Sequence, residues 1–287
     1  MSPAAEVALV VQREIRKNVR SAKGLILLGL SLLGGVIVAL AFNFVATTER
    51  EFIAKQLATL PPEAIADATE KVHREIVLRL GGSDEALGDA LSKAPLALWG
   101  SFKGTVLCGP WLVALLGFDA VSGELQHRTV RFWTVRTRRV SYYVGKVLGL
   151  WAVVSLLTFF VHAIIWVVVI ARGNTAGSVL EWGPRFWACT LPLSLVWCAL
   201  VHLLGSQFRV PILALLMSIV GYFLFVIAWG LGINGKVPPL EFVYPNTYET
   251  WLIHPHLDRV FEGLGICLGC AVAYIAAGAA VFARRDV

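Results

Sequence analysis

Residues 144 to 171 read VGKVLGLWAVVSLLTFFVHAIIWVVVIA, an almost unbroken apolar run. A helix of about 20 apolar residues is long enough to cross the hydrocarbon layer of a bilayer. The only charged residue of the run, Lys146, lies close to its beginning. A soluble core does not require so long a stretch without charge, and the run therefore predicts a membrane-spanning helix.

Five further apolar runs complete the pattern. Together the six runs predict spans at 24–46, 95–117, 144–171, 186–205, 211–232 and 263–283. The composition agrees, because 57% of the residues are hydrophobic and only 15% are charged. Hydrocarbon requires every backbone N–H and C=O to be paired, and no run alternates as a barrel strand would. The predicted fold is an all-α integral membrane protein with six transmembrane helices.

The distribution of charge predicts the orientation. The N-terminus, the 118–143 loop, the 206–210 turn, the C-terminus and Lys146 carry 14 Lys and Arg against 5 Asp and Glu. The opposite side carries 10 against 14. By the positive-inside rule, we expect the first side and both termini to be cytoplasmic in a multi-pass protein of a cell membrane, with a bacterial inner membrane as the expected location. The net charge of +6 is expected to face anionic lipid and not nucleic acid.

Residues 1–23 precede the first span and have an amphipathic pattern. Apolar residues recur at every fourth position in Val7, Val11, Ile15 and Val19. Basic residues lie elsewhere around the same helix, at Arg13, Arg16, Lys17 and Arg20. This pattern predicts an interfacial helix whose basic side chains lie among lipid headgroups.

Two long segments of the transmembrane domain, residues 24–287, are expected on the extracytoplasmic side. Residues 47–94 predict a helical loop, with a solvated hairpin as the alternative. The apolar positions near one face of that loop are Ile65, Val72, Ile76 and Leu80. Residues 233–262 hold four prolines and several aromatic residues, and predict short interfacial helices beside the membrane.

Polar residues within the spans are further candidates. Lys103 is costly at the centre of a bilayer, so it is predicted to line a translocation pathway with Trp99, or alternatively to reach the headgroups by snorkelling. Interhelical hydrogen bonding is the favoured interpretation of Asn43, His162 and His202. Neither the Cys267-x-x-Cys270 pair nor His254 and His256 has further ligands at suitable spacing, so no metal site is predicted.

The 118–143 loop is the candidate functional segment. It carries five arginines, at 128, 131, 136, 138 and 139, interleaved with the apolar residues Val130, Phe132, Trp133 and Val135. This pattern predicts an amphipathic helix along a membrane or against a partner. A topology anchor is the alternative, but an anchor needs only a few positive charges, so the length and mixed chemistry of the loop favour protein docking.

This loop resembles the corresponding loop of the type-2 ABC permeases, which runs Asp, a few residues, Glu, then Gly-Thr, Pro-x-Ser-Arg and Gly-Lys. The residues that fit are Asp119, Glu124, Thr129, Arg139, Gly145 and Lys146. The sequence departs from the pattern at Arg128, in place of Gly, and at Arg136 and Arg138, in place of Pro and Ser. The stretch from Arg13 to Lys23 resembles the connecting helix of the same family.

The resemblance implies a cytoplasmic coupling helix between spans 2 and 3, docked on a separate ATPase subunit. The implied interface residues are Asp119, Glu124, Thr129, Arg131, Arg136, Arg138 and Arg139. It also implies export through a dimer with a second copy or a homologous permease, and leaves room for an accessory extracytoplasmic protein. The chain has no Gly-x-x-x-x-Gly-Lys-Ser/Thr loop, so ATP and Mg²⁺ are expected on the ATPase and no cofactor on this chain.

Two other classes of protein remain alternatives. An integral membrane enzyme is disfavoured because no Gly-x-Ser-x-Gly, His-Glu-x-x-His or paired-carboxylate motif lies in or beside a span. A non-transporting membrane scaffold would use the basic loop to recruit an acidic protein. If an ATPase copurifies with the protein and its activity depends on the loop, the transporter is favoured over both alternatives.

Overall fold

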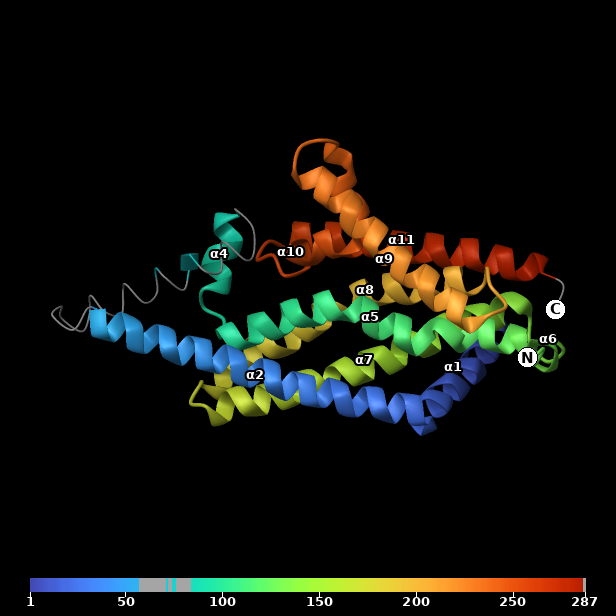
Figure 1. The fold of residues 1–287 in the computed structure, drawn as a ribbon, viewed down its shortest axis with the longest axis horizontal. Coiled ribbons are helices and arrows are strands. Elements are labelled where there is room, and N and C mark those ends of the chain that lie inside the picture. The colour runs from blue at the N-terminus through green and yellow to red at the C-terminus, as the bar shows by residue number, and fades with distance from the viewer. Residues whose placement is uncertain (57–70, 72–73, 76–83, 286–287) are drawn as a thin grey trace.

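A computed structural model describes residues 1–56, 71, 74–75 and 84–285 of the chain (Figure 1). The described residues form helices and turns, and contain no strand. Six of the helices are long and apolar enough to cross a membrane. They are α2 (Ala22–Gln56), α5 (Leu96–Gln126), α7 (Arg139–Ala171), α8 (Ala176–Gly205), α9 (Pro211–Ile233) and α11 (Leu257–Arg284). The prediction of an all-α membrane protein with six transmembrane helices is confirmed.

Shorter elements connect or flank these helices. They are α1 (Pro3–Arg20), α4 (Glu85–Leu91), α6 (Val130–Thr134), η1 (Pro238–Val243), η2 (Pro245–Tyr248) and α10 (Glu249–Leu252), of which η1 and η2 are 3-10 helices. Helix α1 begins where its sequence dictates, because the Ser2 side chain accepts a hydrogen bond from the Ala5 N–H and Pro3 lacks the donor that would otherwise be unpaired. Half of the predicted 47–94 loop, including its apolar positions, lies outside the described residues.

Helix α5 continues well past the predicted span of 95–117. It ends at Gln126, so the first third of the 118–143 segment is helical. The rest of that segment holds a turn, α6 and the first residues of α7. We call residues 118–143 the α5–α7 hairpin.

The hairpin, α1 and both chain ends gather at one end of the helical bundle, whereas α4 lies at the other end (Figure 1). Two buried apolar clusters follow this division. One cluster, at the α1 end, includes Tyr142, Tyr143 and Phe282. The other, toward α4, includes Trp99 and Phe186. The bundle therefore has a core at each end.

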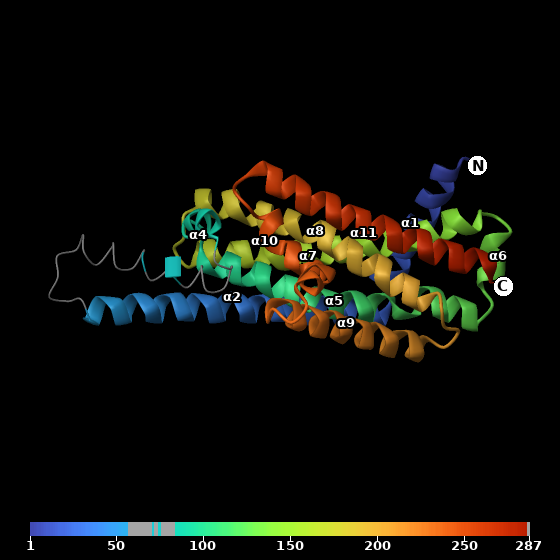
Figure 2. The ribbon, with the colours of Figure 1, turned by 90° about the horizontal axis from the view of Figure 1, so that it is seen from above.

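Helices α2 and α9 are the least buried of the six long helices. Both lie along the lower edge of the bundle in Figure 2. Their outward residues are large and apolar, as at Leu30 and Leu224, whose side chains are exposed. Such surfaces suit lipid or another apolar helix, since water would not solvate them well.

Candidate functional site

The central feature of the α1 end is a buried lysine between two carboxylates. The Lys146 side chain, from α7, has no exposed surface. Its Nζ lies 2.7 Å from Oε1 of Glu14 in α1 and 2.6 Å from Oε1 of Glu124 in α5, and donates to the Ala120 carbonyl at 3.0 Å. All three donor protons of the ammonium are therefore used. One side chain joins three helices.

Two glycines of α7 allow α1 to approach so closely. A Cβ at Gly145 would lie 2.6 Å from the Cβ of Val10, and a Cβ at Gly149 would lie 2.6 Å from the Cβ of Glu14. Side chains at these positions would push α1 away and separate Glu14 from Lys146. The Gly-x-x-x-Gly spacing thus places the two helices in contact, as small residues do in membrane helix pairs.

The Glu124 carboxylate collects further donors. The Tyr142 hydroxyl donates to its Oε2, while Arg13 Nη2 lies 3.2 Å and Lys17 Nζ 3.8 Å from its Oε1. The Arg13 guanidinium also lies 4.0 Å from the centre of the ring of Trp133, which is in α6. A buried carboxylate that is shared among cations and a hydroxyl is stabilised in its ionised form. The network therefore extends from α1 to the tip of the hairpin.

A second ion pair fixes the beginning of the hairpin. Lys23, at the start of α2, lies 2.5 Å from Asp119 Oδ1 and donates to the Leu116 carbonyl at 3.0 Å. At the other end of the hairpin, Glu6 of α1 accepts the backbone N–H of Arg138 at 3.1 Å. This backbone hydrogen bond, followed by one from the Ser141 side chain, lowers the pKa of Glu6 below its ordinary 4.5. Both arms of the hairpin are thus fastened to α1 or α2.

The turn at the hairpin's tip contains a strained residue. Arg128 has a φ of 55°, in the left-handed region, and is the one described non-glycine residue with a positive φ. The chain folds back there because the Thr129 N–H bonds to the Glu124 carbonyl at 3.0 Å. Arg128 occupies the position at which the resembling loops carry glycine, and glycine adopts this conformation without strain.

The predicted interface residues fall into two groups. Asp119 and Glu124 point into the ion-pair network, and the Thr129 hydroxyl donates to the Glu124 carbonyl at 3.4 Å. The exposed group consists of Arg131, Arg136 and Arg138, together with the apolar residues Phe132 and Val135. Arg139 belongs to neither group, because its guanidinium donates to the Ala283 and Arg285 carbonyls at 2.8 and 2.9 Å, at the end of α11.

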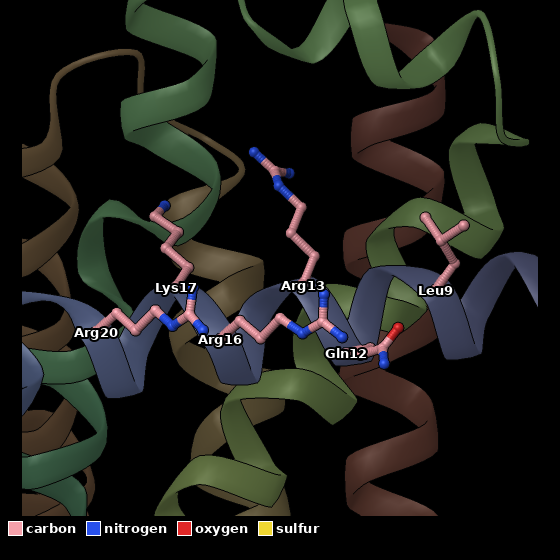
Figure 3. A pocket seen from close by; sticks show the side chains of 6 residues that line it. All are labelled: Leu9, Gln12, Arg13, Arg16, Lys17 and Arg20. Carbon is pink, nitrogen blue, oxygen red and sulfur yellow. The ribbon is translucent and has the colours of Figure 1, made fainter.

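Basic residues of α1 line a shallow hollow of about 430 Å³ (Figure 3). The side chains around it are Leu9, Gln12, Arg13, Arg16, Lys17 and Arg20. Arg13 and Lys17 reach Glu124, whereas no carboxylate of the described chain lies within 4 Å of Arg16 or Arg20. The hollow therefore carries excess positive charge.

The predicted pathway residues lie together toward the α4 end. Lys103 pairs with Glu249 of α10, and its Nζ lies 4.7 Å from the centre of the Trp99 ring. Trp99 itself is fully buried and stacks on Phe102. Burial raises the pKa of Glu249 and the Lys103 ammonium opposes that rise. Lys103 thus has a counter-charge that its own span does not contain.

The buried histidines make bonds within their own helices. His162 bonds to the Thr158 carbonyl at 2.8 Å and His202 to the Cys198 carbonyl at 2.9 Å, in each case four residues earlier. The interhelical bonds expected for these two residues are replaced by this local pairing. The side chain of Asn43 lies outside what the structure describes. His254, just after α10, lies 3.1 Å from Asp84 and so links this segment to the start of α4.

Sequence reasoning missed the roles of Glu14, Tyr142 and Asn246. An acidic residue amid the basic residues of α1, and a lysine two residues into an apolar run, were the available signals for the Glu14–Lys146 pair.

A family model described as an ABC-2 family transporter protein matches residues 8–287. The chain belongs to the ABC-2 transporter family. It is therefore a membrane permease of an ABC transporter, and such a permease works with an ABC ATPase subunit. A search of curated proteins found no match. The described ion-pair network lies in the permease at the segment that resembles the family's coupling helix.

Proposed function

We propose that this permease is the membrane subunit of an ABC exporter and that a separate ATPase docks on the α5–α7 hairpin. The observation that carries the proposal is the buried Lys146, whose one ammonium joins α1, α5 and α7. A hairpin fastened in this way moves together with the helices it connects. Force applied at its tip would pass into the membrane domain as a rigid-body movement.

The hairpin's tip has the chemistry of a docking surface. The side chains of Phe132 and Val135 are 75% and 87% exposed. Arg131, Arg136 and Arg138 surround them and are also exposed. Exposed apolar side chains with an arginine rim are typical of protein interfaces, and the positive charge would select an acidic groove on the partner.

ATP and Mg²⁺ would be bound by the partner, and the permease itself would be no enzyme and carry no cofactor. Two permease copies, identical or homologous, would form the translocation pathway. The apolar surfaces of α2 and α9, on one side of the bundle, support an assembly with a second copy on that side (Figure 2). The hairpin and both termini would face the cytoplasm of a bacterial cell, and an accessory extracytoplasmic protein would meet the α4 end.

Copurification tests the docking. The wild-type permease should retain a Walker-motif ATPase from its native membrane, and Phe132→Asp with Val135→Asp should reduce the retained ATPase more than tenfold. The matched control is Phe242→Asp, an exposed phenylalanine of η1 outside the hairpin, which should retain the ATPase fully. Equal retention by the tip variant would reject the hairpin as the docking site. A permease that purifies without any ATPase would favour a scaffold or a membrane enzyme.

We further propose that the α1 hollow binds the phosphate of an anionic phospholipid. Helix α1 crosses α7 at Gly145 and Gly149, about 9 to 15 Å from the first residue of α7 at 1.5 Å per residue. This level is where the apolar run of α7 begins, and so corresponds to the headgroups, whereas the hairpin's tip lies farther from the membrane. At this level neither Arg16 nor Arg20 has an ion pair among the described residues, so both can meet a lipid phosphate.

Native mass spectrometry tests the lipid site. Phosphatidylglycerol should bind the wild-type permease, and Arg16→Gln with Arg20→Gln should lose at least one bound lipid. Arg172→Gln, an exposed arginine outside α1, is the matched control and should bind as the wild type does. Equal binding of phosphatidylcholine, which carries the same phosphate but no net charge, would reject selectivity for an anionic lipid. Loss of ATPase retention with unchanged lipid binding in the double variant would instead assign the hollow to the ATPase.

A further inference from the structure

The amide of Asn246 is buried and fully hydrogen bonded. Its Nδ2 donates to the Val106 carbonyl and to the Tyr244 hydroxyl, each at 2.9 Å. Its Oδ1 accepts the Nε1–H of Trp197 in α8 at 2.9 Å. An indole N–H can only donate and a carbonyl can only accept, so these partners permit one orientation of the amide. Asn246 thus joins η2 to α5 and α8.

The partner in α5 is a special carbonyl. Val106 lies four residues before Pro110, which is inside α5 and has no N–H to donate. The Val106 carbonyl therefore lacks its helical partner. An unpaired carbonyl costs several kcal/mol in hydrocarbon, but Asn246 supplies the missing donor from another element. The side chain stabilises the break in the backbone hydrogen bonding of α5.

A second contact joins the same two elements. Glu249 pairs with Lys103, which lies three residues before Val106 and hence on the same side of α5. Asn246 and Glu249 both lie in the segment 238–252. Helix α8 also holds this segment, because Cys189 Sγ donates to the Leu252 carbonyl at 3.0 Å. The 238–252 segment thus contacts α5 at Lys103 and at Val106, which are about one helical turn apart and close to Pro110.

The opposite end of α5 carries Asp119, which pairs with Lys23 of α2, and Glu124, which belongs to the network around Lys146. A single helix therefore runs from the 238–252 segment to the α5–α7 hairpin. Its one internal proline lies between these two attachments. Kinks and hinges of helices form at such positions, where one hydrogen bond is already absent.

We propose that Asn246 is a positioning residue that fixes the bend of α5 at Pro110 and so links movement of the 238–252 segment to movement of the hairpin. The link to an ATPase rests on the proposed function, whereas the role of Asn246 in setting the bend does not. When the segment moves, Asn246 leaves Val106, and α5 can change its bend.

A small void adjoins this hydrogen bond. A cavity of about 20 Å³ beside Asn246 and Pro110 has a mainly apolar lining, with Thr105, Thr158, Thr190 and Ser194 among its residues. A void of this size has room for about one water molecule. The four hydroxyls donate to carbonyls of their own helices, so their oxygens can still accept a hydrogen bond from that water. Water in this void would pair with the Val106 carbonyl once Asn246 withdraws. The hydrogen bond from Asn246 to Val106 can therefore hold one bend of α5, and a bond from water can replace it in another.

A double-mutant cycle tests the position of the bond. Asn246→Asp keeps the shape of the side chain but removes both N–H donors, and should lower the midpoint of thermal unfolding by about 3–8 °C. Pro110→Ala restores the helical N–H to Val106. In that background, Asn246→Asp should lower the midpoint by less than half as much. Asn234→Asp, at an exposed asparagine at the end of α9, is the control. It should lower the midpoint of thermal unfolding by less than about 2 °C.

Equal losses in the two backgrounds would overturn the assignment of Asn246 to the proline break. Spin labels at two exposed positions, Lys93 in the turn before α5 and Gln126 at the end of α5, then test the bend. In the permease alone, Asn246→Asp should broaden the distance distribution, and addition of Pro110→Ala should narrow it again. An unchanged distribution in Asn246→Asp would also overturn the proposal.

The complex with its ATPase tests transmission. Trapping with ATP and vanadate should shift the distance in the wild-type complex, and the shift should fall by more than half in Asn246→Asp while ATPase retention stays the same. An undiminished shift would overturn the transmitting role. If the permease alone behaves as expected but no ATPase is retained by the wild type, the proposed function fails and the bend-setting role of Asn246 stands.

Discussion

Glu14 and Lys146 are 132 positions apart in the chain, yet their charged atoms lie 2.7 Å apart where neither side chain is more than 2% exposed. Ions are costly to remove from water, and their attraction repays that cost only with close geometry and complete hydrogen bonding. Glu124, Tyr142 and the Ala120 carbonyl complete the bonding here. Such a network specifies one arrangement of α1, α5 and α7 more than it adds to stability.

Lys146→Met should therefore destabilise the permease strongly. It leaves two buried carboxylates without their shared cation, and a loss of about 3–5 kcal/mol in the free energy of unfolding is expected. Denaturant unfolding in a fixed detergent measures this. Adding Glu14→Gln and Glu124→Gln removes the stranded charges and should recover at least half of the loss. If the triple variant is less stable than Lys146→Met, the carboxylates are not stranded charges.

The turn at the hairpin's tip should be improved by glycine. Arg128 has a φ of 55°, which costs an L-residue about 1 kcal/mol that glycine does not incur. Arg128→Gly should raise the free energy of unfolding by up to about 1 kcal/mol. Arg128→Ala is the matched control, because it removes the side chain but keeps the strain. A gain in both variants would attribute the effect to the lost charge and not to the backbone.

The amino-acid pattern was sufficient for the helices because length and hydropathy are local properties. It was also sufficient to single out Lys103, since a charge inside a span needs a partner. It did not indicate that the partner is Glu249, which lies 146 positions away. The segment around Glu249 is distinguished in the sequence by its prolines and aromatic residues. Long-range pairing of this kind depends on how the helices pack, and hydropathy does not predict that packing.

The same limit explains the division of the hairpin residues. Spacing alone groups Asp119, Glu124 and the five arginines on one loop. Lys23 of α2 pairs with Asp119. Close approach of α1 at Gly145 and Gly149 completes the buried network that holds Glu124. Arg139 donates hydrogen bonds to carbonyls at the end of α11, because these last carbonyls have no helical partner. Four of the arginines, Arg128, Arg131, Arg136 and Arg138, and the apolar tip remain exposed and can meet another protein.

Acid should loosen α1 from the hairpin through Glu6. The Arg138 N–H bond and the Ser141 hydroxyl lower the pKa of the Glu6 carboxyl below 4.5 in the folded protein. A carboxyl with a lowered folded pKa adds stability that is fully present above 4.5 and is lost as the pH falls through the folded pKa. Thermal unfolding at pH 7, 5, 4 and 3 should therefore show a smaller decline for Glu6→Gln than for the wild type.

Glu85→Gln is a control for that series, because Glu85 is an exposed acid in α4, far from the hairpin. It should follow the wild-type curve. Identical curves for Glu6→Gln and the wild type would show that the Glu6 carboxylate does not fasten α1 to the hairpin.

Removing Lys103 should harm the permease more than removing its partner. Burial holds the folded pKa of Glu249 above 4.5, and Lys103 opposes this. A carboxyl with a raised pKa loses stability as the pH rises through that value, because it must ionise where water is scarce. Lys103→Met removes the opposing charge, so the variant should become progressively less stable from pH 5 to pH 8.

The expected loss for Lys103→Met at pH 8 is about 2 kcal/mol, below that of a fully buried pair because Lys103 is 27% exposed. Glu249→Gln cannot ionise, and the lysine it leaves can turn toward water or headgroups. It should therefore lose less than Lys103→Met and show a flatter pH dependence. The double variant should resemble Glu249→Gln. If Lys103→Met and Glu249→Gln have the same pH dependence, Glu249 is not the counter-ion of Lys103, and Lys103 must be neutralised by another group.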